Sequence, residues 1–327
     1  MTRQLTIVIV TVGSVSNLSR CLSSLGSQIF AEFDVVVVSN ARHDAVQEVI
    51  LHSPLADKTR LVRSEVNRGY GAACNLGAQH SDAPFLIFLN DDVYFGEDWL
   101  SELYKSLCSE TNTLFQSRIF HELTEQTRNG NPCDIYGAAG ITFYKGCGTG
   151  EFYASGASLA MSKKIFDALG GFDEALFLYH DDVDLSWRAR LMGFGISSAE
   201  SALCYHSGAS SSTTIPHTTK FYLTQRNRIR LLIKNYSAWR IVSRLPVACI
   251  MIVLGSIFLT LRTRKVGYTI SAINALTWNI TGLGNTLIDR YKIQCRRIKD
   301  DEAVEKAMHK YSMDICVLKH YIAFPAG

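Results

Sequence analysis

Two acidic clusters in the sequence contain the residue types that bind a divalent cation or accept a proton. The first cluster, Asn90-Asp91-Asp92, directly follows an unbroken run of five apolar residues, 85–89. Such a short run is typical of a strand that is buried on both faces in a parallel sheet. Open α/β sheets bind ligands beyond the carboxyl ends of their strands, and carboxylate oxygens there suit Mg²⁺ or Mn²⁺. A polar turn that only closes the strand is the alternative interpretation.

The second cluster, Asp181-Asp182-Val183-Asp184, places three carboxylates within four residues. These groups repel one another unless a cation or a proton relieves the repulsion, and such surroundings are typical of a general base. One or more of them could instead cap the helix that we expect to run on to Met192. Further along, His206 ends an apolar stretch and is a candidate ligand for a metal or a phosphate, although a lone histidine is more often structural.

The elements that would position these clusters alternate between strands and helices. Apolar and β-branched runs predict strands, and apolar residues at helical spacing predict helices. The predicted strands are residues 5–12, 34–40, 59–64 and 85–93, and the predicted helices are residues 17–25, 45–51 and 70–80. This alternation predicts a doubly wound α/β fold with a mainly parallel sheet and flanking helices.

Polar residues at the predicted strand ends fall on one rim of that sheet, because parallel strands point their carboxyl ends the same way. These residues are Thr11, Asn40, Asn67 and Asp92, and the arrangement predicts a nucleotide pocket. Neither G-x-G-x-x-G after the first strand nor G-x-x-x-x-G-K-[ST] occurs, which disfavours a dinucleotide fold and a P-loop. Phosphates would then be neutralised by a metal on Asp92 and by a cation such as Arg68, which could also be an ordinary surface arginine.

The residues between the two clusters are less regular. We expect two edge strands within residues 115–141 and a glycine-rich loop at 146–150. We also expect a strand over 152–161, whose small residues would let a ligand approach the backbone. A helix that begins at Ser162 should end at Gly170-Gly171.

The composition limits the class of protein. The chain has 327 residues, of which 47% are apolar and 19% charged, which indicates one or two packed domains with part of the surface away from water. The net charge of +3 does not indicate nucleic-acid binding. Nine cysteines without a C-x-x-C pair favour reduced thiols in a cytosolic protein over a disulfide framework or a zinc site. We expect no signal peptide, because the apolar run over 5–12 is too short.

Taken together, the motifs of residues 4–235 resemble the family 2 glycosyltransferases of the GT-A fold, especially the rhamnosyltransferase-like branch that builds cell-surface polysaccharides. Each motif is weak alone, and their common order makes the resemblance specific. In chain order they are a threonine strand end at 11, V-V-V-V-S-N at 35–40, N-R-G-Y-G-A-A-C-N at 67–75, F-L-N-D-D-V at 88–93, G-A-S-L at 156–159, G-G-F-D-E at 170–174, F-x-Y-x-D-D-V-D-L-x-x-R at 177–188 and H-S-G at 206–208.

The resemblance implies a role for each matching residue. Asp92 would bind the divalent metal, Mg²⁺ or Mn²⁺, with His206 as a further ligand, and Asp182 would be the catalytic base. The residues along the nucleotide-diphospho-sugar donor would be Thr11, Asn40, Asn67, Arg68, Gly69 and Asp91. The residues on the acceptor side would be Gly156, Asp181 and Trp187.

Three positions depart from the family pattern. Ser39 stands where the family has an aspartate before Asn40, which leaves the usual contact to the nucleotide base without its carboxylate. Asp181 replaces the glutamate of the usual Glu-Asp pair and is one methylene shorter. The first strand also lacks the usual Tyr or Asn after Thr11.

The resemblance implies a metal-dependent, inverting transfer of a sugar to a glycan or to a polyprenyl-linked glycan. Asp182 would take the proton of the acceptor hydroxyl, and the metal on Asp92 would stabilise the diphosphate leaving group. A catalytically inactive glycosyltransferase-like binding subunit is one alternative, which Ser39 keeps open. A nucleotidyltransferase is another, but it would need a basic glycine-rich loop, and residues 12–16 contain no Lys or Arg.

We expect a catalytic domain over residues 1–215, with a donor half over about 1–95 and an acceptor half over about 96–215. The remaining residues, 216–327, should form a C-terminal helical region. Its first helix, over 218–235, is basic and amphipathic, and it would suit either anionic lipid headgroups or a salt-bridged cover. A charged helix is expected over 300–319.

Two uncharged runs in this region, 245–261 and 266–288, predict contact with a membrane. We expect them to lie in or dip into the inner leaflet, so that the protein is cytoplasmic and peripheral or monotopic. A hairpin through the bilayer would leave the cations of 262–265 outside, against the positive-inside tendency. A soluble helical bundle or the interface of a homo-oligomer is the remaining alternative.

Overall fold

The structure is a computed structural model of the chain, and it describes residues 3–41, 44–128, 131–140, 151–208 and 215–316. The chain forms two compact units. The first unit comprises residues 1–130, 154–185 and 194–214, and the second comprises residues 131–153, 186–193 and 215–327. Two segments from the expected acceptor half therefore group with the C-terminal helices. The predicted glycine-rich loop at 146–150 lies outside the described residues.

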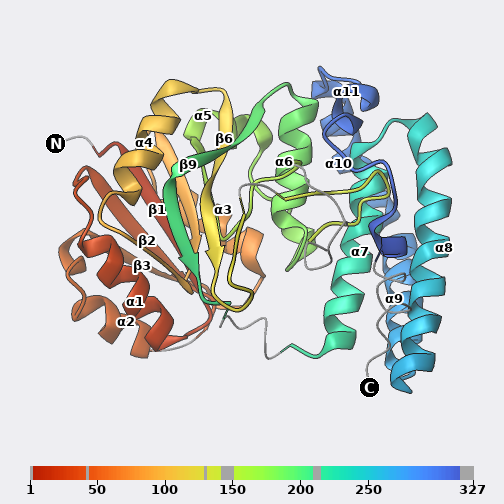
Figure 1. Ribbon diagram of the computed structural model, residues 1–327, viewed down its shortest axis with the longest axis horizontal. Helices are drawn as coiled ribbons and strands as arrows, with labels where there is room; N and C mark the ends of the chain where they lie inside the picture. The colour runs from red at the N-terminus through yellow and green to blue at the C-terminus, as the bar shows by residue number, and fades with distance from the viewer. Residues whose placement is uncertain (1–2, 42–43, 129–130, 141–150, 209–214, 317–327) are drawn as a thin grey trace. The chain divides into compact units, whose positions relative to one another are not determined.

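A mixed sheet forms the centre of the first unit (Figure 1). In the described residues it has nine strands: β1 (Leu5–Thr11), β2 (Phe33–Ser39), β3 (Thr59–Arg63), β4 (Phe85–Asn90), β5 (Val93–Phe95), β6 (Thr113–His121), β7 (Gln126–Arg128), β8 (Ser158–Ser162) and β9 (Gly195–His206). Their order is β3-β2-β1-β4-β8-β6-β9-β5, and β7 pairs with β6. Strands β3, β2, β1 and β4 are parallel neighbours, and β9 runs parallel to β6. The other pairs are antiparallel.

Apolar packing on both faces explains why the parallel strands are continuous apolar runs. Helix α1 (Val15–Gly26) places Leu18, Leu22 and Leu25 in the same core cluster as alternate residues of β1 and β2. On the other face, helix α3 (Tyr70–Ala78) comes so close that a Cβ at Gly77 would lie 2.3 Å from Cγ1 of Val8. Each fully buried aliphatic side chain contributes about 1.5–3 kcal/mol of transfer free energy. The predicted α/β fold is confirmed.

The remaining helices of the first unit flank the sheet. They are α2 (Asp44–Leu51), the 3₁₀ turn η1 (Ala56–Lys58), α4 (Trp99–Ser109), α5 (Lys163–Leu169), the 3₁₀ turn η2 (Glu174–Leu176) and the first part of α6 (Asp181–Leu191). Helix α5 begins and ends as the sequence predicts, because Ser162 Oγ accepts from the Ile165 N–H and Gly170 takes a left-handed φ of +75°.

The prediction of two edge strands within 115–141 is wrong for the first of them. Strand β6 lies inside the sheet between β8 and β9. Its polar residues are satisfied inside the unit: Gln116 Nε2 donates to Ser198 Oγ at 3.1 Å, and Ser117 Oγ accepts from Trp99 Nε1 at 2.8 Å. Buried polar groups are tolerated when they are hydrogen-bonded in this way.

The second unit is built on α7 (His217–Asn235), with α8 (Ala238–Thr263), α9 (Gly267–Thr281), α10 (Leu283–Arg296) and α11 (Asp301–Glu305) (Figure 1). The cations of α7 are mostly buried in this unit. Arg228 pairs with Asp314 at 2.9 Å and Arg230 with Asp289 at 2.7 Å, and the two arginine side chains are only 1% and 2% exposed. These arginines are therefore not available to lipid headgroups. Of the charged helix expected over 300–319, the described residues, which end at 316, show the short α11 and a helical turn at 313–316.

Helix α8 is the one helix of the described residues that is long and apolar enough to cross a membrane, and 17% of its most apolar window is buried. It carries an exposed apolar stripe at helical spacing, which we call the α8 stripe: Trp239, Val242, Ile250, Leu254, Ile257 and Leu261. The second predicted run, 266–288, is interrupted. Helix α9 ends at Thr281, the N–H of the following Gly282 bonds to the carbonyl of Trp278, and α10 begins at Leu283.

Candidate active site

The first acidic cluster lies at the carboxyl end of β4, beside the end of β1. Thr11 Oγ1 donates a 2.6 Å hydrogen bond to Oδ2 of Asp91, so these two predicted donor residues are in contact. Burial raises the pKa of Asp91 to about 6, while the bond from Thr11 opposes the rise and the charge of Asp92 adds to it. The parallel register of β1 and β4 brings these residues together, as the strand-end argument predicts.

Asp92 and His206 form the best candidate metal site. Nε2 of His206 lies 3.2 Å from Oδ1 of Asp92, and the Asp92 side chain has no exposed surface. Neither of these atoms, nor Oδ2 of Asp92, makes a hydrogen bond with the described residues. A buried carboxylate without donors is costly unless a cation neutralises it.

The geometry and chemistry of this pair fit a divalent cation. Two ligand atoms that share one ion, each about 2.1 Å from it, lie about 3 Å apart when they subtend a right angle. No group of three or more His, Cys, Asp or Glu side chains within the described residues forms a complete cage. Mg²⁺-type sites are commonly of this open kind, because the ion keeps water or substrate phosphates among its ligands.

The second acidic cluster begins α6 and is held by the backbone of Gly156. The N–H of Gly156 donates to Oδ2 of Asp182 at 3.0 Å, and its carbonyl accepts from the Tyr70 hydroxyl at 2.6 Å. Burial raises the pKa of Asp182, while the N–H groups of Gly156 and Val183 oppose the rise. The structure thus brings Asp182 and Gly156 together, and it adds Tyr70, which the sequence argument missed.

Asp181 differs from its neighbour in having little to stabilise its charge. Its Oδ1 is buried without a hydrogen-bond partner in the described residues. Burial, and then the charge of Asp182, raise the pKa of Asp181 well above its ordinary value. The pair therefore favours one negative charge, on Asp182, with a proton on Asp181.

A strained loop connects the donor rim to this cluster. Phe177, Tyr179 and His180 all have positive φ, between +65° and +69°. The N–H of Tyr70 bonds to the carbonyl of Phe177 at 2.8 Å, and a Cβ on Gly69 would lie 1.9 Å from that carbonyl oxygen. Glycine is therefore required at 69, where φ is +95°. Such strain persists where the surrounding structure imposes it, often at functional sites.

Two of the predicted donor residues hold this glycine in place. Asn67 Oδ1 accepts from the Gly69 N–H at 2.9 Å, and Asn40 Nδ2 donates to the Gly69 carbonyl at 3.2 Å. Arg68, by contrast, points to the surface, with its side chain 69% exposed and paired with Glu174 at 2.7 Å. Its predicted place along the nucleotide stays a prediction.

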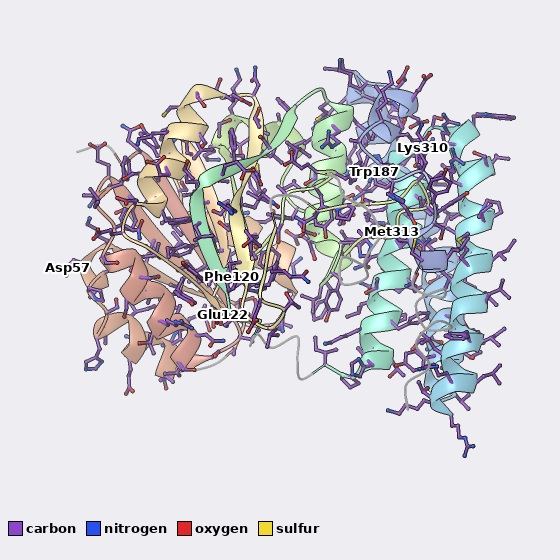
Figure 2. The ribbon with its side chains drawn as sticks, viewed as in Figure 1. Asp57, Phe120, Glu122, Trp187, Lys310 and Met313 are labelled. Carbon is purple, nitrogen blue, oxygen red and sulfur yellow. The ribbon has the colours of Figure 1, made fainter. Side chains whose placement is uncertain are left out.

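Trp187 lies in the second unit and is fully buried there (labelled in Figure 2). Its ring packs edge-on against Phe152 at 5.6 Å and Tyr236 at 4.9 Å between centroids. This is the packing of a core residue, with no surface to offer an acceptor. The acceptor role of Trp187 stays a prediction without structural support.

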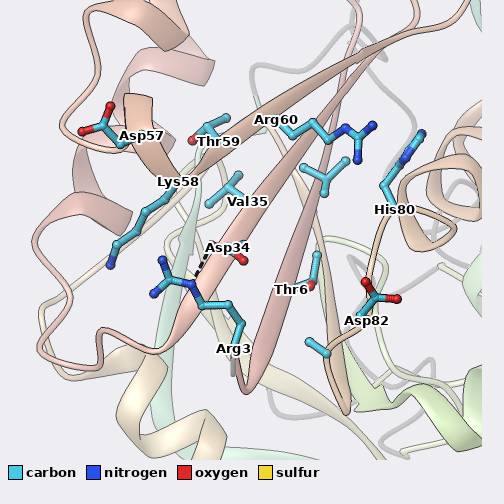
Figure 3. A pocket seen from close by; sticks show the side chains of 12 residues that line it. Arg3, Thr6, Asp34, Val35, Asp57, Lys58, Thr59, Arg60, His80 and Asp82 are labelled. Atoms are coloured by element: carbon cyan, nitrogen blue, oxygen red, sulfur yellow. Dashed lines mark ion pairs between the residues drawn. The ribbon is translucent and has the colours of Figure 1, made fainter. Parts of the chain in front are cut away.

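A pocket of about 500 Å³ lies at the opposite edge of the sheet, where β1, β2 and β3 begin (Figure 3). Charges of both signs line it, and Arg3 and Asp34 pair across it at 2.9 Å. It is separate from both acidic clusters, which lie beyond the carboxyl ends of the strands. We therefore assign the candidate active site to the clusters rather than to this pocket.

Comparison with known proteins identifies the family. The profile described as Glycosyl transferase family 2 matches residues 6–170, half of the chain. The chain therefore belongs to glycosyl transferase family 2, and it is a glycosyltransferase that uses a nucleotide-sugar donor. The narrower rhamnosyltransferase-like branch is not distinguished by this match.

Two curated relatives agree with this family. The low-salt glycan biosynthesis hexosyltransferase Agl10 of Haloferax volcanii is 23% identical over 244 residues, which cover 70% of this chain and 75% of that protein. The glycosyltransferase GlyA of Streptococcus pneumoniae is 31% identical over 101 residues, 31% of this chain and 14% of that protein. Because the chain spans so little of GlyA, that protein is a guide to the family only.

Solved structures agree with the fold. Staphylococcus aureus TarS 1–349 in complex with UDP-GlcNAc has a TM-score of 0.57 and 17% identity, covering 93% of this chain and 90% of that one. The mannosyltransferase PcManGT from Pyrobaculum calidifontis, in complex with GDP-Man and Mn²⁺, has a TM-score of 0.54 and 13% identity, covering 98% and 88%. At these identities the likeness shows the GT-A-like fold alone.

Proposed function

We propose that this protein is a metal-dependent, inverting glycosyltransferase that moves a sugar from a nucleotide-diphospho-sugar to a glycan or lipid-linked glycan in cell-surface polysaccharide biosynthesis. The observation that carries the proposal is the contrast between two buried carboxylates. Asp92 lacks hydrogen-bond donors and faces His206, whereas Asp182 is oriented by the Gly156 N–H. Asp92 is thus suited to bind a cation, and Asp182 is suited to accept a proton.

The donor would lie along the rim formed by Thr11, Asn40, Asn67, Gly69 and Asp91. The loop around Gly69 is held by the side chain of Asn40, directly after β2, and by that of Asn67 within the loop, so its backbone is preorganised for close approach of phosphates. Asp92 and His206 would hold Mg²⁺ or Mn²⁺, which supplies Lewis-acid stabilisation of the diphosphate leaving group when bound.

The acceptor hydroxyl would be activated by Asp182. Its oxygen forms the new bond to the anomeric carbon, the bond from that carbon to the diphosphate oxygen breaks, and Oδ1 or Oδ2 of Asp182 takes the proton. A raised pKa makes Asp182 a better match to the operating pH than an ordinary carboxylate. The raised pKa of Asp181 favours its neutral form, which would limit repulsion beside the base.

A catalytically inactive binding subunit is the second candidate, and one contact favours it. Ser39 Oγ bonds to the backbone carbonyl of Ala41 at 2.7 Å, and Ser39 is 1% exposed. Its side chain therefore does not replace the carboxylate that contacts the nucleotide base in the family. Hydrolysis or transfer of a donor sugar that EDTA abolishes would separate the enzyme from an inactive subunit.

The donor can be identified by thermal unfolding of the purified protein with a panel of UDP-, dTDP- and GDP-sugars, each with and without Mn²⁺. A ligand that binds the native state raises Tm by mass action, because it adds about 2.7 kcal/mol to the free energy of unfolding at a concentration 100 times Kd. We expect one nucleotide class to stabilise the protein only when Mn²⁺ is present. No stabilisation by any donor would contradict the proposal.

We also propose that the protein is cytoplasmic and peripheral on the membrane, with the α8 stripe in contact with the inner leaflet. The stripe is apolar and strongly exposed, with Trp239 and Leu261 each 75% exposed. Arg262, Arg264 and Lys265 follow it directly and are exposed, so they would lie among anionic headgroups. A membrane site would suit a lipid-linked acceptor.

A further inference from the structure

A second histidine contacts the candidate metal ligand His206. Nδ1 of His121 lies 3.2 Å from Nδ1 of His206, and the two rings meet edge to face with centroids 5.2 Å apart. The two residues belong to the first unit, at the ends of β6 and β9. Figure 2 labels Phe120 and Glu122, which flank His121 on this end of the strand.

An irregularity in strand pairing brings the two histidines face to face. Strands β6 and β9 pair residue by residue until Ser117 and Ala199, and pairing resumes between Arg118 and Leu203. Three residues of β9, 200–202, therefore have no counterpart on β6. Because of this shift, His206 pairs with His121. A β-bulge commonly re-aims a side chain in this manner.

The backbone around the pair is also fixed. The N–H of Glu122 bonds to the carbonyl of His206 at 3.1 Å, and the N–H of Ser207 bonds to the carbonyl of Asp92 at 3.0 Å. The ends of β6, β9 and β4 are thus tied together at this point. The contact between the two imidazoles is a built feature of the sheet.

The contact between the two imidazoles determines which ring nitrogen of each histidine carries a proton. Two nitrogens 3.2 Å apart attract only if one carries a proton and the other presents a lone pair. For Nε2 of His206 to bind a cation, that nitrogen must present its lone pair. A neutral His206 then carries its proton on Nδ1, which donates to Nδ1 of His121. His121 must accept with a lone pair and carry its own proton on Nε2.

We infer that His121 is a positioning residue that fixes the tautomer and the ring orientation of His206, so that Nε2 faces the cation beside Asp92. The inference rests on the proposed role of His206 as a metal ligand. Histidine ligands generally donate their other ring N–H to an acceptor that orients them, and loss of such a partner typically costs 10–100-fold in metal affinity. Histidine is an uncommon choice for that acceptor, and only one of its tautomers can serve.

The test compares two substitutions of similar size, His121→Asn and His121→Leu. Asparagine keeps a hydrogen-bond acceptor close to the position of Nδ1, and leucine removes it. The affinity of the full-length protein for Mn²⁺ is measured by the electron paramagnetic resonance signal of free Mn²⁺, without donor sugar. We expect His121→Leu to weaken Mn²⁺ binding about tenfold or more, and His121→Asn to stay within about threefold of the wild type.

Two controls separate the possible failures. His206→Leu tests the metal-ligand assignment itself, and His52→Leu removes an exposed histidine of the same unit and should change nothing. If His206→Leu weakens Mn²⁺ binding and His121→Leu does not, the positioning role is wrong while the metal site stands. If His206→Leu has no effect, both the ligand assignment and this inference fall.

The paired substitution also distinguishes positioning from a general packing effect. Equal losses in His121→Asn and His121→Leu would overturn the inference, because lost packing does not discriminate between them. Should His121→Leu fail to fold, His121→Phe replaces it, since phenylalanine keeps a ring but has no acceptor. In an activity assay, the loss in the apolar variant should appear as a higher Mn²⁺ requirement that added Mn²⁺ overcomes.

Discussion

The backbone N–H of Gly156 donates a 3.0 Å hydrogen bond to Oδ2 of Asp182. The orientation of this carboxylate is therefore set by the main chain at the start of β8 rather than by another charged side chain. An amide in its place can still accept from the Gly156 N–H through its oxygen, although the second bond, from the Val183 N–H to Oδ1, is then lost. The substitution Asp182→Asn can thus keep the contact with the Gly156 N–H while it removes the capacity of the side chain to accept a proton.

We expect Asp182→Asn to lower kcat by roughly 10² or more, because the acceptor hydroxyl loses its general base. Donor affinity should change little, and Tm should fall because one of the two N–H groups that bond to Asp182 loses its acceptor. Asp167→Asn is the matched control, since the side chain of Asp167 on α5 is 58% exposed and pairs with Lys163. The measurement is initial-rate kinetics with purified donor and acceptor, and near-normal turnover of Asp182→Asn would refute its assignment as the base.

Removal of the metal should stop turnover. Treatment with EDTA should abolish transfer and added Mn²⁺ or Mg²⁺ should restore it, and Asp92→Ala should lose about 10² or more in kcat without rescue by the metal. Thr11→Ala is a useful comparison, since it removes the bond to Asp91 but leaves Asp92 in place. Full activity in EDTA would exclude a catalytic cation at Asp92 and His206.

Gly69→Ala should destabilise the protein for two reasons, an unfavourable backbone conformation and a steric clash. Comparison with Gly170→Ala separates the two. Both Gly69 and Gly170 have positive φ, +95° and +75°. An alanine costs about 1–2 kcal/mol in the left-handed conformation of Gly170 and about 1–3 kcal/mol at Gly69, where ψ is −178°. At Gly170 a Cβ meets nothing within 4 Å, whereas at Gly69 it would lie 1.9 Å from the Phe177 carbonyl oxygen. We expect Gly69→Ala to lower Tm clearly more than Gly170→Ala and to lower kcat as well. Equal shifts in Tm would mean that the loop before Asp181 adapts freely.

The stability of the second unit should fall as pH rises from acid to neutral. Burial raises the pKa of Asp134 from 3.8 to about 6, against the attraction of Arg228. The folded state then binds the proton more tightly than the unfolded state, so this contribution is full below pH 3.8 and is lost as pH rises through about 6. Between pH 4.5 and 7 the loss is about 2 kcal/mol.

Urea unfolding of the wild type and of Asp134→Asn at several pH values measures this contribution. The asparagine variant cannot titrate, so the difference in unfolding free energy between the two proteins should change by about 2 kcal/mol over that range. The variant is also expected to be less stable at neutral pH, because Oδ2 of Asp134 accepts from the Met313 N–H at 2.7 Å. A difference that does not vary with pH would show that Asp134 titrates normally.

A negative charge introduced into the α8 stripe by substitution should release the protein from lipid vesicles. We expect the wild type to float with vesicles containing phosphatidylglycerol and Leu254→Glu to remain largely in solution. Leu51→Glu is the matched control, since Leu51 on α2 is 62% exposed and Leu254 is 60% exposed. A wild type that does not float, but forms a dimer that Leu254→Glu dissociates, would assign the stripe to a second copy of the chain.

The parallel half of the fold and the two acidic clusters follow from local sequence. Buried strands such as β1 and β4 are continuous apolar runs, and their ends are marked by Thr11 and Asp91, so the rim can be located from the sequence alone. Asp182 is found in the same way, because its cluster opens a helix. The parallel strands and the acidic clusters depend on residues that are neighbours in sequence, and the pattern of apolar and polar residues therefore predicts them.

Features that depend on register were not predictable. His121 meets His206 only because three residues of β9 lie outside the pairing, and nothing in their composition marks that shift. The irregular pattern of residues 115–141 predicts an edge strand, and it does not show that Gln116 and Ser117 of β6 find partners distant in sequence. The absence of charge over 266–288 does not reveal the break at Gly282, because α9 ends there through the bond from the Gly282 N–H to the Trp278 carbonyl.

The three residues of β9 without a counterpart on β6, 200–202, have a consequence for sequence change in this protein. Side chains alternate between the faces of a strand, so the loss of one residue between 200 and 202 would turn position 206 to the opposite face without altering any residue of the site. Substitutions at Glu200 or Ser201, which are exposed, should be well tolerated. Over residues 200–202 the number of residues is constrained, whereas their identities can vary. Homologues that keep a histidine at the position of His206 should therefore also keep its spacing from position 199.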